Sequence, residues 1–397
     1  MTITNSNDVY YDPYDVETGA DPFPVFRRLR NETPLYHNER YDFYALSRHE
    51  DVERALARND IYISGRGVVL EQIRANMPIP PGTVIFEDPP THGIHRSLLA
   101  RLFTPRKIAA LEPQIRDFTV RTLDPLVGAG GFDFIRDLAL QLPMRVIGML
   151  LGIPEQDQAS VRDSYLGGQI GRPQEFEEGL LDGAMFADYI DWRAAHPSDD
   201  LMTELMTAEF TDEHGVSRRL TRDEVLAYVN ILAAAGNETT GRLIGWTGKT
   251  LADHPDQRRE LAQDPSLIPN AIEEILRFDP PALQTCRYVA TDVEVHGQTV
   301  PAGSVMMLIL ASANRDPRRY PDPDPETFDI HRSIGQHLTF ALGAHYCLGA
   351  ALARLEGRVA LDEVLRRFPD WEVDEANAHL VSTSTFRGWS RLPVRTA

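Results

Sequence analysis

The most informative stretch of this sequence is Phe340-Ala341-Leu342-Gly343-Ala344-His345-Tyr346-Cys347-Leu348-Gly349. Its skeleton is F-x-x-G-x-x-x-C-x-G, and an amphipathic helical pattern begins directly after the cysteine. A cysteine at a helix N-terminus faces the positive end of the helix dipole, which favours the thiolate. Gly343 and Gly349 have no Cβ, so the backbone there can approach a flat ligand closely. The stretch predicts a loop that presents a reactive thiolate, with a buried structural cysteine as the alternative.

A second informative stretch lies inside a long helical pattern in the middle of the chain. Thr221 and Glu224 form a capping box that opens this pattern, and Pro255 ends it. Within it stand Ala235-Gly236-Asn237-Glu238-Thr239-Thr240. Glycine inside a helix costs about 1 kcal/mol relative to alanine, so Gly236 is expected to have a local reason. The alternative is an ordinary hydrogen bond from the Thr239 hydroxyl to the helix backbone, with Glu238 on the surface.

Together the two stretches resemble the cytochrome P450 family, the haem-thiolate monooxygenases. The first is similar to the family's haem-binding loop, except that Ala341 stands where the family usually has glycine. The second is similar to its oxygen-activation motif, A-G-x-(D/E)-T. The resemblance covers nearly the whole chain and implies one domain over residues 1–397. The implied fold is mainly α with a minor β portion, with a long central helix over the haem and the cysteine loop below it.

The resemblance also implies roles for individual residues. Cys347 is the implied iron ligand, and a thiolate ligand favours cleavage of the O–O bond. Thr239 would steady bound dioxygen, and Glu238 would relay protons from solvent. The residues implied to hold the haem or its propionates are Phe340, Gly343, Ala235, Gly236, His92, Arg96, Arg287 and His345. The implied cofactor is non-covalent haem b, because no C-x-x-C-H sequence occurs.

Helical phase adds an expectation about the long helix. At about 100° per residue, four side chains share the face of Thr239 and are expected to face the substrate cavity or its roof. These are Tyr228, Leu232, Ala235 and Gly236. Gly236, beside a hydroxyl residue, is expected to open the helix for dioxygen and water.

Three further motifs are assigned from the same resemblance. Glu274 and Arg277 form an E-x-x-R pattern that, with Arg332, implies a structural network holding the cysteine loop. His92 and His95 have a spacing that could ligate a metal, but no zinc motif accompanies them. Cys286 precedes Arg287 in a β-rich segment, so we expect it to point to the opposite face as a small core residue.

Periodicity outlines the remaining elements. Helices are expected at 22–31, 49–59, 104–127, 134–151, 180–195, 268–278 and 348–367, besides the long one from 221 to 254. A hairpin is expected at 35–47, and further β-rich segments at 287–295 and 305–311.

Composition limits the partners. The chain has 397 residues, with 40 basic against 59 acidic ones, and this net charge of −19 argues against broad binding to nucleic acid. Neither a signal peptide nor a membrane-spanning stretch is visible, which leads us to expect a cytoplasmic protein. We also expect a monomer. No flavin, nicotinamide or ATP motif occurs, so electrons are expected from a separate partner. The resemblance implies that this partner is a ferredoxin with its reductase. A basic patch for that partner is predicted from Arg101, Arg106, Lys107, Arg354 and Arg358, with a scattered solvated surface as the alternative.

The expected reaction is insertion of one oxygen atom from O2 into an apolar small molecule. The resemblance implies that four segments line its pocket: 65–86, 165–186, 283–285 and 382–386. A peroxide-driven haem oxygenase is the alternative enzyme, which the Glu238–Thr239 pair disfavours because peroxide chemistry needs no protons relayed to dioxygen. A non-catalytic haem-binding protein is the alternative outside enzymes.

Overall fold

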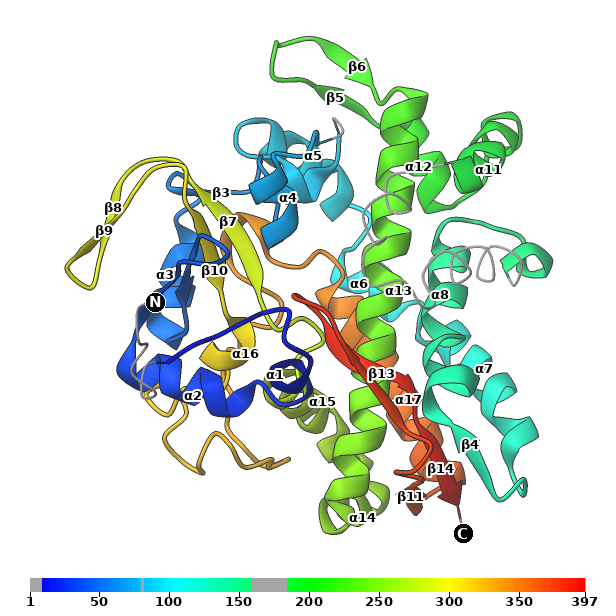
Figure 1. The fold of residues 1–397 in the computed structure, drawn as a ribbon. Coiled ribbons are helices and arrows are strands. Elements are labelled where there is room, and N and C mark those ends of the chain that lie inside the picture. The colour runs from blue at the N-terminus through cyan, green and yellow to red at the C-terminus, as the bar shows by residue number, and fades with distance from the viewer. Residues whose placement is uncertain (1–8, 80–81, 159–183, 397) are drawn as a thin grey trace. The chain divides into compact units, whose positions relative to one another are not determined.

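The structure is a computed structural model that describes residues 9–79, 82–158 and 184–396 (Figure 1). The chain divides into two compact units, each assembled from separate stretches. The first comprises Met1–Ile79, Glu273–Cys347 and Leu380–Gly388, and the second Pro80–Ile272, Leu348–His379 and Trp389–Ala397. The cysteine loop therefore belongs to the first unit, and the long central helix to the second.

The first unit is built on a five-stranded sheet with the order β1-β2-β10-β7-β3. Its strands are β1 (Leu35–Asn38), β2 (Phe43–Leu46), β3 (Tyr62–Ile63), β7 (Thr285–Val289) and β10 (Val305–Leu308). β1 and β2 form the expected hairpin, with Leu35 opposite Leu46, and β10 runs parallel to β2 and antiparallel to β7. A separate hairpin joins β8 (Val293–Val295) to β9 (Gln298–Val300).

Two hydrophobic clusters make up the core of this unit. Along β10, Met307 belongs to one cluster, whereas Met306 and Leu308 belong to the other, as the alternation of a strand requires. The helices of the unit are α1 (Val16–Ala20), α2 (Phe23–Glu32), α3 (His49–Ala57), α4 (Leu70–Ala75) and α16 (Leu310–Ala313), with α15 (Ile268–Phe278) running into it. The expected helices at 22–31, 49–59 and 268–278 are confirmed.

The second unit is organised around helix α13 (Arg222–Asp253), the long green helix of Figure 1. The capping box is present, because the Glu224 N–H donates to the Thr221 hydroxyl at 3.2 Å and the Thr221 N–H donates to the Glu224 carboxylate at 2.7 Å. The helix ends at His254, before Pro255, as predicted. It packs against α8 (Leu142–Leu150), η3 (Phe134–Ala139) and α17 (Ala350–Arg367).

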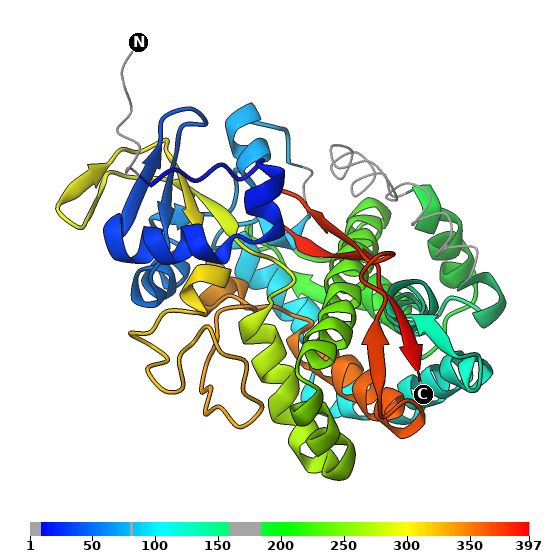
Figure 2. The ribbon, with the colours of Figure 1, turned by 60° about the horizontal axis from the view of Figure 1, so that its bottom comes forward.

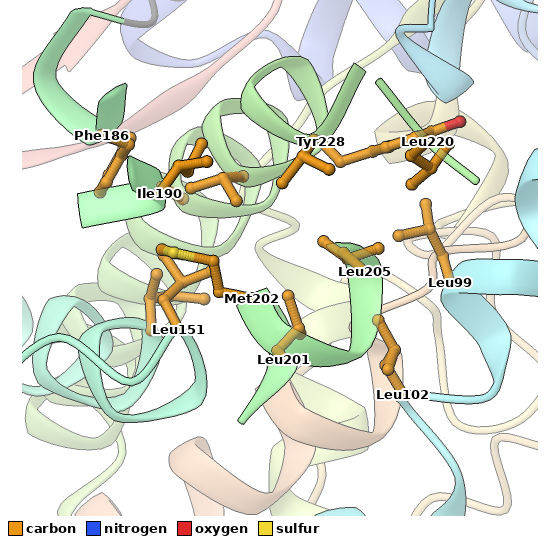
Figure 3. Close-up of a cluster of buried hydrophobic side chains, with 14 of the residues drawn as sticks. Leu99, Leu102, Leu151, Phe186, Ile190, Leu201, Met202, Leu205, Leu220 and Tyr228 are labelled. Carbon is orange, nitrogen blue, oxygen red and sulfur yellow. The ribbon is translucent and has the colours of Figure 1, made fainter. Parts of the chain in front are cut away.

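A large hydrophobic cluster fills the space beside the first half of α13 (Figure 3). Leu99 and Leu102 reach it from α5 (Thr91–Ala100) and the residues after it, and Ile190 reaches it from α11 (Ala184–Ala195). Leu201, Met202 and Leu205 come from α12 (Leu201–Thr207). Burial of these side chains, rather than the propensity of any single helix, holds this part of the unit together.

Smaller elements complete the second unit. They are η1 (Val84–Phe86), α6 (Pro105–Ala109), α7 (Glu112–Leu123), η2 (Asp124–Leu126), α14 (Pro255–Gln263) and η4 (Pro265–Leu267), with the hairpin β5 (Glu209–Thr211) and β6 (Ser217–Arg219). A three-stranded sheet has the order β11-β14-β4, from β11 (Trp371–Val373), β14 (Pro393–Thr396) and β4 (Gly131–Asp133). β14, red in Figures 1 and 2, runs antiparallel to the orange β11. β12 (His379–Ser382) pairs with β13 (Arg387–Arg391), and residues 380–388 of this pair belong to the first unit.

Two expected helices are divided into shorter elements, and one expected strand is shorter than the periodicity indicates. The stretch 104–127 is divided into α6, α7 and η2, and 134–151 into η3 and α8. Pro113 and Pro143 stand in the first turns of α7 and α8, where a missing N–H is tolerated and a new helix begins. The strand expected at 305–311 ends at Leu308. The expected helix at 180–195 is seen from Ala184, and residues 180–183 lie outside the described ranges.

No helix within the described ranges is long and apolar enough to cross a membrane. The same ranges contain no group of three or more His, Cys, Asp or Glu side chains arranged to hold a metal ion.

Candidate active site

The cysteine loop is a tight turn held by its own backbone. The Cys347 N–H donates to the Phe340 carbonyl at 2.9 Å, and the Tyr346 N–H to the Gly343 carbonyl at 3.1 Å. Gly343 has a φ of +67°, and a Cβ there would lie 3.1 Å from the Leu56 carbonyl oxygen, so glycine is required for both reasons. Cys347 is a half-buried cysteine that forms no disulfide, and α17 begins three residues after it, at Ala350.

Ala341 also lies in the left-handed region, with a φ of 54°. A side chain in this conformation costs about 1–2 kcal/mol, whereas glycine adopts it freely. The alanine that departs from the family pattern therefore strains the loop. Its methyl group packs, with Leu342, against the hydrophobic cluster that contains Val289 of β7.

The E-x-x-R motif forms the expected buried network. Glu274 and Arg277 are completely buried, and the Arg277 guanidinium donates to both oxygens of Glu274, at 2.6 and 2.7 Å. Arg332 Nε donates to Glu274 Oε1 at 3.1 Å, and its other nitrogens donate to the backbone carbonyls of Pro323, Asp324 and Thr327. One carboxylate thus fixes two guanidiniums and, through them, the loop that precedes the cysteine stretch.

This network is continuous with the start of the cysteine loop. The Thr339 hydroxyl donates to the carbonyl of Leu276 on α15 at 2.7 Å, and the amide of Asn314 donates to that hydroxyl at 2.8 Å. The carbonyl of the same amide accepts from the Leu338 N–H at 2.7 Å. Phe340 follows directly, and its ring packs edgewise against Tyr346. The predicted link between E-x-x-R and the cysteine loop therefore consists of these hydrogen bonds.

Arg287 and Cys286 point to opposite faces of β7. Cys286 is buried in a hydrophobic cluster, and this burial raises the pKa of its thiol. It is the small core residue that the strand alternation predicts. Arg287 Nη1 donates to the Thr285 hydroxyl at 2.9 Å and to the Cys286 carbonyl at 2.7 Å, which orients the guanidinium.

In the second unit, the Thr239 hydroxyl donates to the carbonyl of Ala235 at 2.7 Å. This is the backbone hydrogen bond that the sequence leaves open as an alternative, and it leaves the oxygen lone pairs of the hydroxyl able to accept. The neighbouring Glu238 carboxylate accepts from Arg242 on the same helix, with Nη2 at 2.5 Å and Nε at 3.2 Å. The motif therefore presents a hydroxyl and a paired acid side by side.

Gly236 has a packing role that the sequence analysis misses. A Cβ there would lie 2.9 Å from the end of the Ile147 side chain on α8, so its absence lets the two helices approach. The expectation that Tyr228 faces a cavity is wrong. Tyr228 is fully buried in the hydrophobic cluster of Figure 3, and its ring lies edgewise to His95 at 5.8 Å. Helix α13 is long enough that residues on one face have different surroundings. Thr239 belongs to the expected site, whereas Tyr228 on the same face lies in the hydrophobic core.

Helix α5 carries His92 and Arg96 one turn apart, so they lie on one face. His92 is buried, and burial, together with the nearby charge of Arg96, lowers its pKa. His95 is bound instead to the Glu87 carboxylate, with Nδ1 at 2.8 and 2.9 Å from the two oxygens. This Glu87–His95 pair is a feature that no sequence motif indicated.

The expected site residues are thus divided between the two units. The first unit contains Cys347, Phe340, Gly343, His345 and Arg287. The second unit contains His92, Arg96, Ala235, Gly236, Glu238 and Thr239. The chemistry of this donor set fits a haem. It offers one half-buried thiol for the iron and, in Arg96, Arg287 and two histidines, only cationic or N–H donors for two propionates.

Comparison with known proteins agrees with this fit. Residues 178–394 match the family model "Cytochrome P450". A putative cytochrome P450 123 of Mycobacterium tuberculosis is 38% identical over 392 residues, covering 96% of each chain. The vitamin D(3) 25-hydroxylase of Pseudonocardia autotrophica is 37% identical, covering 99% of this chain and 98% of that one. The structure of cytochrome P450 CYP109Q5 from Chondromyces apiculatus superposes with a TM-score of 0.87 at 34% identity, covering 98% of both chains.

A mainly helical fold with these motifs defines a haem-thiolate oxidoreductase. The chain belongs to the cytochrome P450 family and is a monooxygenase with a haem-iron cofactor.

Proposed function

We propose that this protein binds haem b through Cys347 and uses O2 to hydroxylate an apolar small molecule, with electrons from a ferredoxin and its reductase. The observation that carries the cofactor assignment is the position of Cys347, half-buried and outside any disulfide, in a loop tied to the buried Glu274–Arg277–Arg332 network. The haem, when bound, supplies the iron at which dioxygen is cleaved. The propionates would be held by His92, Arg96, Arg287 and His345.

On the dioxygen side, the residues of α13 supply protons and polarity. The Thr239 hydroxyl, held by the Ala235 carbonyl, can accept a hydrogen bond from one neighbour while remaining fixed. Glu238 stands next to it as the acid that exchanges protons with solvent. This pair favours the use of O2 over the use of peroxide, because peroxide brings its own protons.

Parts of three of the four proposed pocket segments are joined by hydrogen bonds within the first unit, as a shared lining requires. The Cys286 N–H donates to the Val68 carbonyl at 2.7 Å, and the Leu283 N–H to the Thr385 carbonyl at 2.8 Å. Gln284 also donates to the Ser384 carbonyl. Segment 165–186 lies almost entirely outside the described ranges. The relative from Pseudonocardia autotrophica is named for the 25-hydroxylation of vitamin D(3), which makes bulky apolar compounds the first to screen.

The proposed ferredoxin surface is smaller than the sequence suggests. Helices α6 and α17 pack together, which places Arg106, Arg354 and Arg358 on adjoining elements. Lys107, however, is bound to both oxygens of Glu204, at 2.6 and 2.8 Å, so its charge is largely neutralised. We propose the arginines as the docking charges.

Turnover of a compound that shifts the haem spin state tests this function. The expected result is product formation with O2, a plant-type ferredoxin and its NADPH-dependent reductase, lost in Thr239→Ala by about 10²-fold, the size of a typical proton-transfer contribution. Turnover with hydrogen peroxide should survive in that variant. Equal loss with both oxidants, or product formed with peroxide alone, would contradict the proposal.

A further inference from the structure

A cavity of about 640 Å³ lies in the second unit and shares no residue with the set assigned to haem and dioxygen. It is lined by α7, by the end of α8 with the residues after it, by the end of α11 and by residues 198–200. Helices α7 and α8 lie side by side in Figure 1. Pockets that hold small molecules have volumes of about 300–1,000 Å³. No residue of this lining belongs to the four proposed substrate segments, so the proposed reaction gives the cavity no role.

One wall of the cavity is a buried ion pair that is fixed in place. Arg193 Nε lies 2.9 Å from Asp200 Oδ2, and the two side chains are 9% and 6% exposed. The other nitrogens of Arg193 donate to the carbonyls of Gly152 and His196. Gly152 has a φ of +70°, and a Cβ there would lie 2.7 Å from Arg193 Nη2, so glycine lets the pair pack against the backbone. This wall is therefore preformed and electrically neutral.

The lining as a whole has more acids than bases. Four carboxylates and two guanidiniums line the cavity, which gives it a formal charge of −2. Beside the neutral wall, Arg121 is shared by two acids, with Asp117 Oδ2 at 3.0 Å and Glu155 Oε1 at 2.8 Å. Asp199 is exposed and makes no ion pair with any described residue. This excess of negative charge favours a positively charged ligand.

Gln158 is a buried amide in the lining that lacks one hydrogen bond. It is 6% exposed, its Nε2 donates to the Ile153 carbonyl at 2.9 Å, and its Oε1 has no partner among the described residues. A Cβ on Gly148 would lie 2.8 Å from Gln158 Cγ, so the side chain packs closely on α8 and is held there. A buried acceptor without a partner costs on the order of 1–3 kcal/mol. A ligand with N–H groups that reach this oxygen would remove that cost.

We propose that this cavity is a second ligand site and that it takes an organic guanidinium, a planar cation with several N–H donors, carried on an apolar body. The cation pairs with Asp199 and donates to Gln158, because the guanidinium fork can serve a carboxylate and an amide oxygen at once. The apolar body packs against Phe118 and Ile153, two buried apolar residues of the lining. This site is additional to the substrate site of the proposed function.

Calorimetric titration of the haem-loaded protein with benzylguanidinium tests the site. The matched control ligand is benzylurea, which has nearly the same shape and also carries N–H groups but has no charge. We expect benzylguanidinium to bind about tenfold more tightly, the effect of one charge-assisted contact. The Soret band should not change, since a guanidinium keeps its proton and offers the iron no lone pair. No binding, equal binding of benzylurea, or a Soret shift that tracks the binding would overturn the inference.

Three variants locate the binding. Asp199→Asn should weaken benzylguanidinium about tenfold and leave benzylurea unchanged, with an unaltered unfolding midpoint because the side chain is exposed. Gln158→Met keeps the volume but removes the oxygen, so it should weaken both ligands. Glu213→Gln removes one charge from the turn between β5 and β6, outside the cavity, and should change neither.

Two outcomes for these variants contradict the site. Parent-like binding of benzylguanidinium by Asp199→Asn would show that the cation lies elsewhere. An equal loss in Glu213→Gln would show attraction by the net charge of the protein alone. The titration needs no turnover, so a failure of the proposed function, seen as a missing thiolate spectrum or no O2 consumption, is distinguishable from a failure of this site.

Discussion

Glu356, on α17, is a buried acid that has no role in the motifs or in the proposed chemistry. It is 2% exposed, and its Oε2 has no hydrogen-bond partner within the described ranges. Burial raises its pKa from 4.5 to about 8, so the folded protein keeps it neutral at pH 7. A proton held in the folded state and lost from the unfolded chain makes stability depend on pH.

The sign of that dependence follows from the raised pKa. The contribution of the protonated group to stability is fully present below about pH 4.5 and is lost as the pH rises through 8. Glu356→Gln stays neutral throughout, so it should be more stable than the parent at pH 9 by a few kcal/mol and similar to it at pH 4.5. Denaturant unfolding at both pH values measures this, and equal stability of parent and variant at pH 9 would contradict it.

A second acid on the same helix provides the contrast. Glu363 is bound by Arg116 and Arg367. Glu363→Gln removes a paired carboxylate, so it should destabilise the protein at pH 7 rather than stabilise it.

At the residue scale, the sequence predicts the residues that occur in a recognisable pattern. Cys347, Cys286 and the Glu274–Arg277–Arg332 network are where the motifs and the strand alternation place them. Glu356 and the Glu87–His95 pair have no such pattern, because only tertiary packing decides which acid is buried and what it meets.

At the scale of the element, the glycines of α13 show why the sequence predicts the ends of a helix but not the contacts that the helix makes. The capping box and Pro255 define both ends of the helix. Its interior glycines are close-packing positions: a Cβ on Gly241 would meet the Ala139 carbonyl oxygen at 3.0 Å, and one on Gly248 would meet the Phe134 ring at 2.7 Å. Helix periodicity carries no information about which neighbour approaches, so these contacts are found only in the structure.

Gly248→Ala is expected to destabilise the protein by about 1–3 kcal/mol, because the new methyl group overpacks against a buried ring. Gly236→Ala should destabilise the protein less than Gly248→Ala. Its new methyl group meets only the end of the flexible Ile147 side chain, and alanine adds about 1 kcal/mol of helix propensity. Thermal unfolding compares the two. Rescue of Gly248→Ala by Phe134→Leu would support the packing account, and equal effects of the two alanine substitutions would contradict it.

At the scale of the whole molecule, the fold class, the order of the elements and the family follow from the sequence. The breaks in the segments 104–127 and 134–151 do not, because apolar periodicity continues through Pro113 and Pro143 while the backbone begins a new helix there. The net charge of −19 argues against broad nucleic-acid binding but identifies no partner. The single domain over residues 1–397 remains a prediction, as does the arginine surface for a ferredoxin.

The central claim is that Cys347 is the thiolate ligand of a haem iron. The absorption spectrum of the reduced, carbon-monoxide-bound protein tests it most directly. The account predicts the red-shifted Soret band of a thiolate-ligated haem, lost in Cys347→Ser and retained in Cys286→Ser, which alters only a buried core residue. A Soret band without that shift, or one that Cys347→Ser leaves unchanged, would contradict the account.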